Sequence, residues 1–310
     1  MHDRRVETRD RRAETRDQRA EMRDRRAEML VDPRWLAANL AAPQLRILDC
    51  TTYMIAQPVG ASLIRSGRPD YDEAHIPGAQ HVDMVDDLSA PAAPFPYTMP
   101  PPAQIEALLG RLGIGNEHHI VVYGRGHIPT VTRVWYVLHA MGHRKLSILD
   151  GGFERWQREG LPATREVPRF APVDYRTSFD PRRVADLNEV RAALSDTDVL
   201  LLNALGRDQF AGSGGAHYGR PGRIPGSVNV PARELADQET KVFHSTERIR
   251  ALFDATNALS APRVLAYCGG GIAASAAAFA LEMLGHPDWA VYDNSLLEWS
   301  AEAGLPMIVG

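Results

Sequence analysis

Short hydrophobic runs alternate along the chain with longer amphipathic segments. Runs of this length between polar loops are typical of buried strands. They occur at 45–49, 119–123, 146–150, 199–202, 263–267 and 289–293. Helical patterns follow two of them, at 131–141 and in the segment that ends at Leu284. This alternation predicts an α/β protein with small, mostly parallel sheets flanked by helices.

The two halves of this pattern repeat each other. His75-Ile-Pro-Gly has a counterpart in Arg223-Ile-Pro-Gly. In each half a Gly-His pair is followed seven residues after the His by Asp, and six residues later by Trp. A repeated spacing of this kind predicts two similar domains rather than one large sheet. We place these domains at 30–162 and 184–310, joined by the Pro- and Arg-rich linker 163–183.

Residues 1–29 form a separate and strongly charged segment. Its seven-residue repeat, as in RRAETRD, mixes Arg with acidic residues and has only one apolar position per repeat. A coiled coil needs two such positions, so we expect a solvated helix or disorder. The folded part then starts near Met29, where Asp32 is suited to cap a helix with Pro33 in its first turn.

The composition of the chain argues against several classes of protein. The formal net charge of −4 gives no indication of a nucleic-acid partner. The apolar runs are too short to span a membrane, so no membrane partner is expected. The two cysteines, Cys50 and Cys268, indicate neither a disulfide framework nor a cysteine zinc site. We therefore expect no bound metal and a reducing, cytoplasmic location.

Cys268 comes directly after the apolar run 263–267. It is followed by a predicted sulfur-cradling loop and helix start, formed by Gly269, Gly270, Gly271, Ile272 and Ala273. Three glycines permit a tight turn whose backbone N–H groups face the sulfur, and a helix N-terminus favours negative charge there. A thiol in this position is expected to be partly ionised and nucleophilic.

The residues alone leave two other interpretations of this stretch. A lone cysteine after an apolar strand is often a small buried hydrophobic residue. A Gly-rich turn before a helix can instead hold phosphate, but Gly-Gly-Gly-Ile lacks both the Lys-Ser/Thr ending of a P-loop and the G-x-G-x-x-G spacing. For Cys50, at the end of a strand in the first half, a structural role is expected.

The motifs together resemble the tandem rhodanese-like sulfurtransferases, the group that contains thiosulfate sulfurtransferase and 3-mercaptopyruvate sulfurtransferase. The resemblance covers about residues 30–310. It rests on the two Ile-Pro-Gly motifs, on Tyr97-Thr-Met-Pro-Pro and on Asn294-Ser-Leu-Leu-Glu-Trp. It implies two rhodanese-like domains, of which only the second carries the working cysteine. Gly124 stands in the first half where Cys268 stands in the second.

The resemblance also implies a reaction without a cofactor. The Cys268 thiolate would attack the outer sulfur of a small donor, thiosulfate or 3-mercaptopyruvate, and become a persulfide. Cyanide, a thiol or a thioredoxin-like protein would then accept this sulfur.

The chain departs from both subgroups where a donor would bind. Resemblance to the thiosulfate enzymes implies Arg-Lys after the cysteine, and resemblance to the mercaptopyruvate enzymes implies hydroxyl groups at 270 and 273; this chain has Gly or Ala at these positions. The mercaptopyruvate group also implies two arginines where this chain has Leu205 and Gln209.

Other side chains must therefore bind the donor. The residues proposed for this role are Arg207, Arg223 and, reaching in from the first domain, His75, with Arg220 as a further arginine. The arginines can equally be solvated loop residues. For the histidine, the preferred interpretation is that it fixes the turn at Ile-Pro-Gly.

Three functions of other classes are alternatives to sulfur transfer. A rhodanese-like phosphatase needs an arginine that closes the cysteine loop, but residues 273–275 are Ala, Ala and Ser. A persulfide carrier and a non-catalytic sulfur-binding regulatory module both remain open, because each suits a pocket with few charges.

Overall fold

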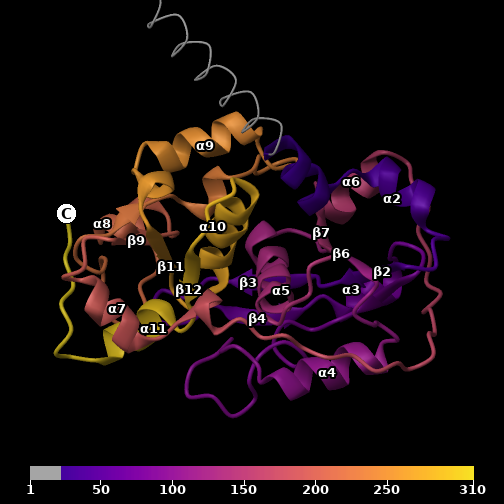
Figure 1. Cartoon of the computed structure of the whole chain (residues 1–310), viewed down its shortest axis with the longest axis horizontal. Coiled ribbons are helices and arrows are strands. Elements are labelled where there is room, and N and C mark those ends of the chain that lie inside the picture. Colours follow the sequence, from indigo (N-terminus) through magenta and orange to yellow (C-terminus); the bar gives the residue numbers. More distant parts are fainter. Residues whose placement is uncertain (1–21) are drawn as a thin grey trace, which may run out of the picture.

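The structure is a computed structural model that describes residues 22–310. Two five-stranded sheets lie side by side, each flanked by helices (Figure 1). The strands of the first sheet fall between residues 30 and 149, and those of the second between 184 and 292. All neighbouring strands within both sheets run parallel. The predicted α/β fold is confirmed.

The first half contains seven strands and five helices. Its strands are β1 (Leu30–Val31), β2 (Leu45–Asp49), β3 (Thr52–Ile55), β4 (Leu63–Ser66), β5 (Ala79–His81), β6 (His119–Tyr123) and β7 (Leu146–Leu149). Its helices are α2 (Pro33–Asn39), α3 (Arg68–Glu73), α4 (Pro102–Arg111), α5 (Ile128–Ala140) and α6 (Gly152–Arg158). Strands β3 and β4 form a separate antiparallel hairpin.

The second half contains five strands and five helices, besides short 3₁₀ turns. Its strands are β8 (Val184–Ala185), β9 (Val199–Asn203), β10 (Val228–Asn229), β11 (Arg263–Tyr267) and β12 (Trp289–Tyr292). Its helices are α7 (Leu187–Ala193), α8 (Arg207–Ala211), α9 (Thr246–Asp254), α10 (Ile272–Met283) and α11 (Ser295–Ala301).

The two sheets have the same strand order. The first runs β5-β2-β6-β7-β1 and the second β10-β9-β11-β12-β8. Side-chain contacts repeat as well: the Tyr123 hydroxyl accepts from Ile76 N–H at 3.2 Å, and the Tyr267 hydroxyl accepts from Ile224 N–H at 3.1 Å. The internal repeat seen in the sequence therefore corresponds to two copies of one architecture.

The residues at the N-termini of α2 and α5 explain where these helices begin. Asp32 caps α2 by accepting a hydrogen bond from Arg34 N–H at 2.8 Å, with Pro33 in the first turn, as predicted. Helix α5 starts at Ile128, earlier than the predicted 131, because Pro129 is compatible with a first helical turn.

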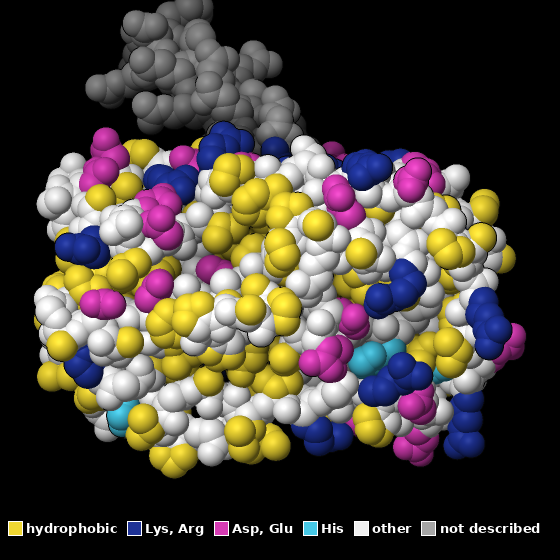
Figure 2. Space-filling model, turned by 90° about the horizontal axis from the view of Figure 1, so that it is seen from below, with side chains coloured by type: hydrophobic (Ala, Val, Ile, Leu, Met, Phe, Trp, Pro, Cys, Tyr) yellow, Lys and Arg dark blue, Asp and Glu magenta, His cyan; other side chains and the backbone are white. Residues whose placement is uncertain are grey.

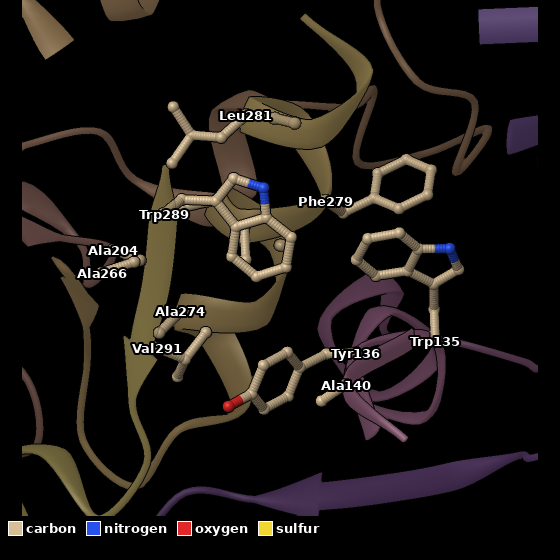
Figure 3. Packing of buried hydrophobic residues seen from close by; sticks show 14 of the residues in the cluster. Trp135, Tyr136, Ala140, Ala204, Ala266, Ala274, Phe279, Leu281, Trp289 and Val291 are labelled. Atoms are coloured by element: carbon tan, nitrogen blue, oxygen red, sulfur yellow. The ribbon is translucent and has the colours of Figure 1, made fainter. Parts of the chain in front are cut away.

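Helices α5 and α10 pack against each other between the two sheets (Figure 1). Trp135 meets Phe279 edge-on, with ring centroids 4.9 Å apart, and Trp289 of β12 lies near both helices (Figure 3). The Thr132 and Ser275 hydroxyls are 2.9 Å apart in the same interface. Since α5 and α10 each follow the central strand of their sheet, this packing brings the ends of β6 and β11 toward the junction of the halves.

Residues 22–29 are helical and contact both halves. Arg26 donates to the carbonyl of His244 at 2.9 Å and lies 3.8 Å from the Asp150 carboxylate. This part of the charged segment is therefore not a free surface helix. Residues 1–21 lie outside the described residues, so the expectation for the repeat as a whole stays a prediction.

The predicted linker runs along the first half without helix or strand between 165 and 180. It is fixed by backbone bonds from Val173 N–H to Gly110 O and from Ser178 N–H to Met141 O. On the face shown in Figure 2, hydrophobic side chains gather in the middle, and charges of both signs are interspersed around them. No helix among residues 22–310 is long and apolar enough to cross a membrane.

Candidate active site

Cys268 lies at the carboxyl end of β11, between the ends of β9 and β12. Its side chain is buried, at 2 % exposure, and is a free thiol. The backbone N–H of Cys268 donates to the Ser295 hydroxyl at 3.0 Å, and its carbonyl accepts from Leu296 N–H at 3.2 Å. The start of α11 therefore fixes the cysteine from one side.

The three glycines are each required by a different neighbour. A Cβ at Gly269 would lie 2.0 Å from Cζ of Tyr218, and one at Gly270 would lie 2.9 Å from a methyl group of Leu297. Gly271 has φ +79°, and a Cβ there would lie 2.3 Å from the carbonyl oxygen of Asp293. The expectation that side chains would obstruct this turn is confirmed.

The loop leads directly into α10, which starts at Ile272. Within the described part of the chain, the N–H groups of residues 269–273 make no backbone hydrogen bond outside α10. The first N–H groups of any helix have no acceptor inside it, so they remain available to an anionic group at this end. Such donors suit a thiolate and the terminal sulfur of a persulfide.

Ser295 is a site residue that the sequence reasoning did not single out. Its φ is +52°, a conformation that non-glycine residues rarely adopt. The first half has Gly152 at the equivalent position, with φ +58°. The signal in the sequence was a serine at a position where the internal repeat has glycine. The structure shows that this position is left-handed, and strained residues of this kind gather at functional sites.

The first half carries no cysteine at the equivalent point. Gly124 follows β6, and its carbonyl accepts from Phe153 N–H as that of Cys268 accepts from Leu296. Cys50 directly follows β2 nearby, and its thiol donates to the Tyr123 carbonyl at 3.1 Å. Burial, with a contribution from Asp49, raises the pKa of the Cys50 thiol well above its usual value. These contacts favour the structural role expected for Cys50.

The first half reaches into the Cys268 site through Arg133 of α5. This side chain is 1 % exposed, pairs with Asp293 at 2.7 Å and donates to the Gly271 carbonyl at 3.4 Å. Burial alone would lower the pKa of Arg133, but the neighbouring Asp293 carboxylate raises it overall. Sequence reasoning missed Arg133, although the one arginine in a helix that is mostly apolar was a detectable signal.

Two further first-half segments cover the site. Tyr97, with φ +66°, packs with Ile272 in a small buried cluster, and its hydroxyl donates to Ser62 O at 2.8 Å. The tip of the β3–β4 hairpin pairs with the second half: Gly60 N–H donates to His217 O at 2.8 Å. The candidate active site is therefore formed by both halves.

The structure places His75 in a structural position. Its ring nitrogens lie 2.8 Å from the Tyr71 carbonyl and 3.0 Å from the Glu166 carbonyl, and the ring stacks on Tyr71. Its backbone pairs in both directions with Thr164. With these groups occupied, the ring has neither nitrogen left for a donor at Cys268.

Arg223 occupies the repeat position of His75 in the second half. Its backbone pairs with Ile308 as that of His75 pairs with Thr164. Its guanidinium lies over the Phe210 ring and donates to the Phe210 and Gly310 carbonyls. The internal repeat already aligned these two residues, and this equivalence was the available signal that both have a structural task.

The side chains of Arg207 and Arg220 also bind partners other than the Cys268 loop. Arg207 forms a two-point ion pair with Glu234 at 2.7 and 2.9 Å, and its side chain is 61 % exposed. Arg220 donates to the carbonyls of Trp299, Glu302 and Leu305. The contacts of these residues do not bring them to Cys268, so a donor clamp built from them finds no support in the geometry.

Gln209, by contrast, lies close to Tyr218, whose ring is next to Gly269. Its side-chain nitrogen donates to the Ala216 carbonyl at 2.8 Å, and its oxygen accepts from Gly206 N–H at 3.3 Å. Burial raises the pKa of Tyr218 to about 12, a negative charge on Cys268 contributes in the same direction, and a hydrogen bond from Gln209 opposes both. Tyr218 therefore lies next to the Cys268 loop, as its contact with Gly269 also shows. Sequence reasoning missed it because nothing in its local motif marks it.

Comparison with known proteins agrees with this architecture. The model of the rhodanese-like domain matches the chain twice, over residues 32–159 and 186–302. Human 3-mercaptopyruvate sulfurtransferase is 31% identical over 88% of this chain and 92% of its own length. Bovine thiosulfate sulfurtransferase is 31% identical over 87% of this chain and 91% of its own length.

A solved structure supports the same assignment. That of SseA from Escherichia coli, described as a 3-mercaptopyruvate sulfotransferase with the rhodanese fold, superposes with a TM-score of 0.75 at 26% identity. The match covers 86% of this chain and 98% of that chain. The chain therefore belongs to the tandem-domain rhodanese-like sulfurtransferases.

Proposed function

We propose that this sulfurtransferase moves a sulfane sulfur from a small donor to a thiophilic acceptor through a persulfide on Cys268. The observation that carries the proposal is the pairing of a buried thiol with the glycine turn at the start of α10, which leaves the N–H groups of residues 269–273 for the sulfur. Gly124 at the equivalent point of the first half assigns the chemistry to one half only.

The first step is attack of the Cys268 thiolate on the outer sulfur of the donor. An S–S bond forms, and the bond that held this sulfur in the donor breaks, with its electron pair leaving on the remainder: sulfite from thiosulfate, or the pyruvate carbon skeleton, which then takes a proton, from 3-mercaptopyruvate. The backbone donors stabilise negative charge first on the thiolate and then on the terminal persulfide sulfur.

The second step returns the enzyme to its starting state. A nucleophilic acceptor such as cyanide, a small thiol or a thioredoxin-like protein attacks the terminal sulfur, and the electron pair of the S–S bond returns to Cys268. The sulfur is carried by the protein itself, so the cycle needs no cofactor or metal. Because Cys50 and Cys268 are both free thiols, we also place the protein in a reducing compartment such as the cytoplasm.

One observation favours a second function, that of a persulfide carrier fed by a thiol or protein donor. Arg207, Arg220 and Arg223 are committed to Glu234 or to backbone carbonyls, and Arg133 is paired with Asp293. With these four guanidinium groups already paired, a donor of low charge would suit the site. A purely regulatory sulfur-binding module would share this site but would not turn over.

Intact-protein mass spectrometry tests the proposal. After incubation with thiosulfate or 3-mercaptopyruvate, we expect a mass increase of one sulfur atom, which is lost on addition of cyanide with formation of thiocyanate. Cys268→Ala should abolish the increase, whereas Cys50→Ala, as the matched control, should retain it. Loading from a thiol persulfide alone would favour the carrier, and loading without release to any acceptor would favour the module.

A further inference from the structure

The Tyr218 ring lies against the Cys268 loop with its hydroxyl end foremost. A Cβ at Gly269 would lie 2.0 Å from Cζ, the ring carbon that carries the hydroxyl group, and 2.1 and 2.5 Å from the two carbons beside it. The side chain is partly buried, so it is neither sealed in the core nor free in solvent. A donor bound at Cys268 therefore has a phenol group close to it.

The position of this ring is fixed by the residues on either side of it. His217 exchanges backbone hydrogen bonds with the hairpin tip, donating to Pro58 O at 3.2 Å and accepting from Gly60 N–H at 2.8 Å. Gly219 packs so closely that a Cβ there would lie 2.9 Å from Cβ of Ser300. The phenol is therefore held in place before a donor binds, as general acid catalysis requires.

The hydroxyl group of Tyr218 accepts a hydrogen bond but has no acceptor for its own proton. The Gln209 amide nitrogen donates to the Ala216 carbonyl at 2.8 Å, and the amide oxygen accepts from Gly206 N–H at 3.3 Å. With the amide oriented in this way, its nitrogen also donates to the Tyr218 hydroxyl, which opposes the rise in the pKa of that group. Among residues 22–310, no group accepts a hydrogen bond from the Tyr218 hydroxyl in return. Its proton is therefore available to a ligand.

The other hydroxyl groups near the loop are already used. Residues 269–273 themselves carry none. Three neighbours donate to carbonyl oxygens: Tyr97 to Ser62 at 2.8 Å, Ser295 to Tyr292 at 2.7 Å and Ser275 to Ile272 at 2.6 Å. Burial raises the pKa of Tyr218 to about 12, so this phenol is protonated at neutral pH and can donate. Among the described side chains at the loop, Tyr218 is left as the neutral proton donor.

The two candidate donors differ in their need for a proton. Attack on thiosulfate releases sulfite, which is stable in water as an anion. Attack on 3-mercaptopyruvate breaks a C–S bond, and its electron pair leaves as the enolate of pyruvate, a strong base that must be protonated. A general acid placed at such a leaving group accelerates the step by about 10²–10⁴-fold. Only the second donor therefore depends on a proton donor at this site.

We propose that the Tyr218 hydroxyl is the catalytic proton donor for a 2-keto acid thiol such as 3-mercaptopyruvate. The Cys268 thiolate forms the S–S bond, the C–S bond breaks, and Tyr218 gives its proton to the enolate, which becomes pyruvate. The terminal S–H of the new persulfide is a stronger acid than a phenol, so it returns a proton to Tyr218 and remains as the persulfide anion. Protons and electrons balance without a further reactant. This inference rests on the sulfur transfer proposed above.

The test compares kcat/KM for 3-mercaptopyruvate and for thiosulfate, with cyanide as acceptor, because in a two-step cycle this constant reports the donor half-reaction alone. Tyr218→Phe keeps the ring and removes only the hydroxyl group. We expect kcat/KM for 3-mercaptopyruvate to fall about a hundredfold and that for thiosulfate to stay within about twofold. Tyr71→Phe is the matched control: its hydroxyl donates to Ala79 O at 2.8 Å within the first half, so the two constants should keep their ratio.

Gln209→Leu is a second variant, which leaves the phenol in place but removes the amide bonded to it. The fall in kcat/KM for 3-mercaptopyruvate should be smaller, about fivefold, as the loss of one hydrogen bond would cause, and absent with thiosulfate. Thermal unfolding curves show whether each variant is folded. If Tyr218→Phe does not fold, the donor ratio of Gln209→Leu decides the matter.

A fall of the same size with both donors would show that Tyr218 only shapes the site, and no fall with either would exclude its hydroxyl group; both results overturn the proposal. If the unmodified chain forms a persulfide from thiosulfate but not from 3-mercaptopyruvate, sulfur transfer stands and the role of Tyr218 fails. If it forms a persulfide with neither donor, the proposed function fails, and the role of Tyr218 fails with it.

Discussion

Arg133 and Asp293 form an ion pair across the two halves of the protein, with 2.7 Å between Nη1 and Oδ1, and both side chains are nearly fully buried. The second carboxylate oxygen of Asp293 accepts from Met99 N–H at 2.5 Å. The guanidinium also donates to the carbonyls of Gly271 and Tyr97. The half without a nucleophile thus fixes the turn that carries the nucleophile of the other.

Replacement of Arg133 by Leu should lower the free energy of unfolding by about 3–5 kcal/mol, because it leaves the Asp293 charge buried without a partner. The yield of Cys268 persulfide should fall with it, since Gly271 loses its support. Denaturant unfolding and intact mass measure the two effects. Arg207→Leu is the matched control: its pair with Glu234 is exposed and should be worth about 1 kcal/mol or less. Equal stability of the two variants would contradict the assignment.

The sequence was most informative for the part of the site whose residues are consecutive in the chain. Cys268 and its glycines are consecutive, so the turn and the helix start could be predicted from residue type alone. The internal repeat predicted two similar domains, and the two sheets do share one strand order. These features depend on spacing along the chain, which the sequence shows directly.

The rest of the site is formed by residues that are distant from one another in sequence, so no local pattern could predict it. Tyr218 and Arg133 lie far from Cys268 in sequence, and only the packing of loop 212–222 and of α5 places them there. His75 was named as a donor ligand from the family resemblance, and Arg223 was named because its charge could replace a missing arginine. Their backbone bridges to Thr164 and Ile308 show that the fold already uses these residues.

Gly271→Ala should disrupt the turn more than backbone strain alone explains. A left-handed conformation costs an alanine roughly 1–2 kcal/mol, and here the new Cβ would also lie 2.3 Å from the Asp293 carbonyl oxygen. Gly226→Ala is the matched control, with φ +77° and no heavy atom within 4 Å of the added carbon. We expect Gly226→Ala to lose only the strain energy and to keep persulfide formation. If both variants lose the same stability in thermal unfolding, the close contact at Gly271 is not restrictive.

His75→Ala should lower stability but not sulfur transfer. It removes a ring that lies between the Tyr71 and Glu166 carbonyls and so leaves at least one of these carbonyls without its N–H donor, at a cost of about 1–3 kcal/mol. Unfolding curves give the loss in stability, and kcat/KM at a temperature where the variant is folded gives the catalytic effect. A large fall in kcat/KM without loss of stability would return His75 to the list of donor-binding residues.

Stability should fall in mild acid because of His143. This buried ring lies 3.1 Å from the Tyr175 hydroxyl and 3.0 Å from the His118 carbonyl. Burial lowers the pKa of His143 from 6.5 to about 4, so the unfolded chain binds a proton that the folded chain does not between these values. The free energy of unfolding is therefore highest above about pH 6.5. It decreases as the pH falls toward 4, by up to about 1.4 kcal/mol per pH unit.

The contribution of this one ring is separable from that of its neighbours. His139 of α5, whose pKa burial lowers to about 3, gives a slope of the same sign. In His143→Gln the slope of unfolding free energy against pH should fall by about one proton, or about 1.4 kcal/mol per pH unit, in the range between the two pKa values of His143. The slope follows from urea unfolding at a series of pH values. An unchanged slope would show that the folded protein already protonates His143 near its ordinary pKa, contrary to its burial.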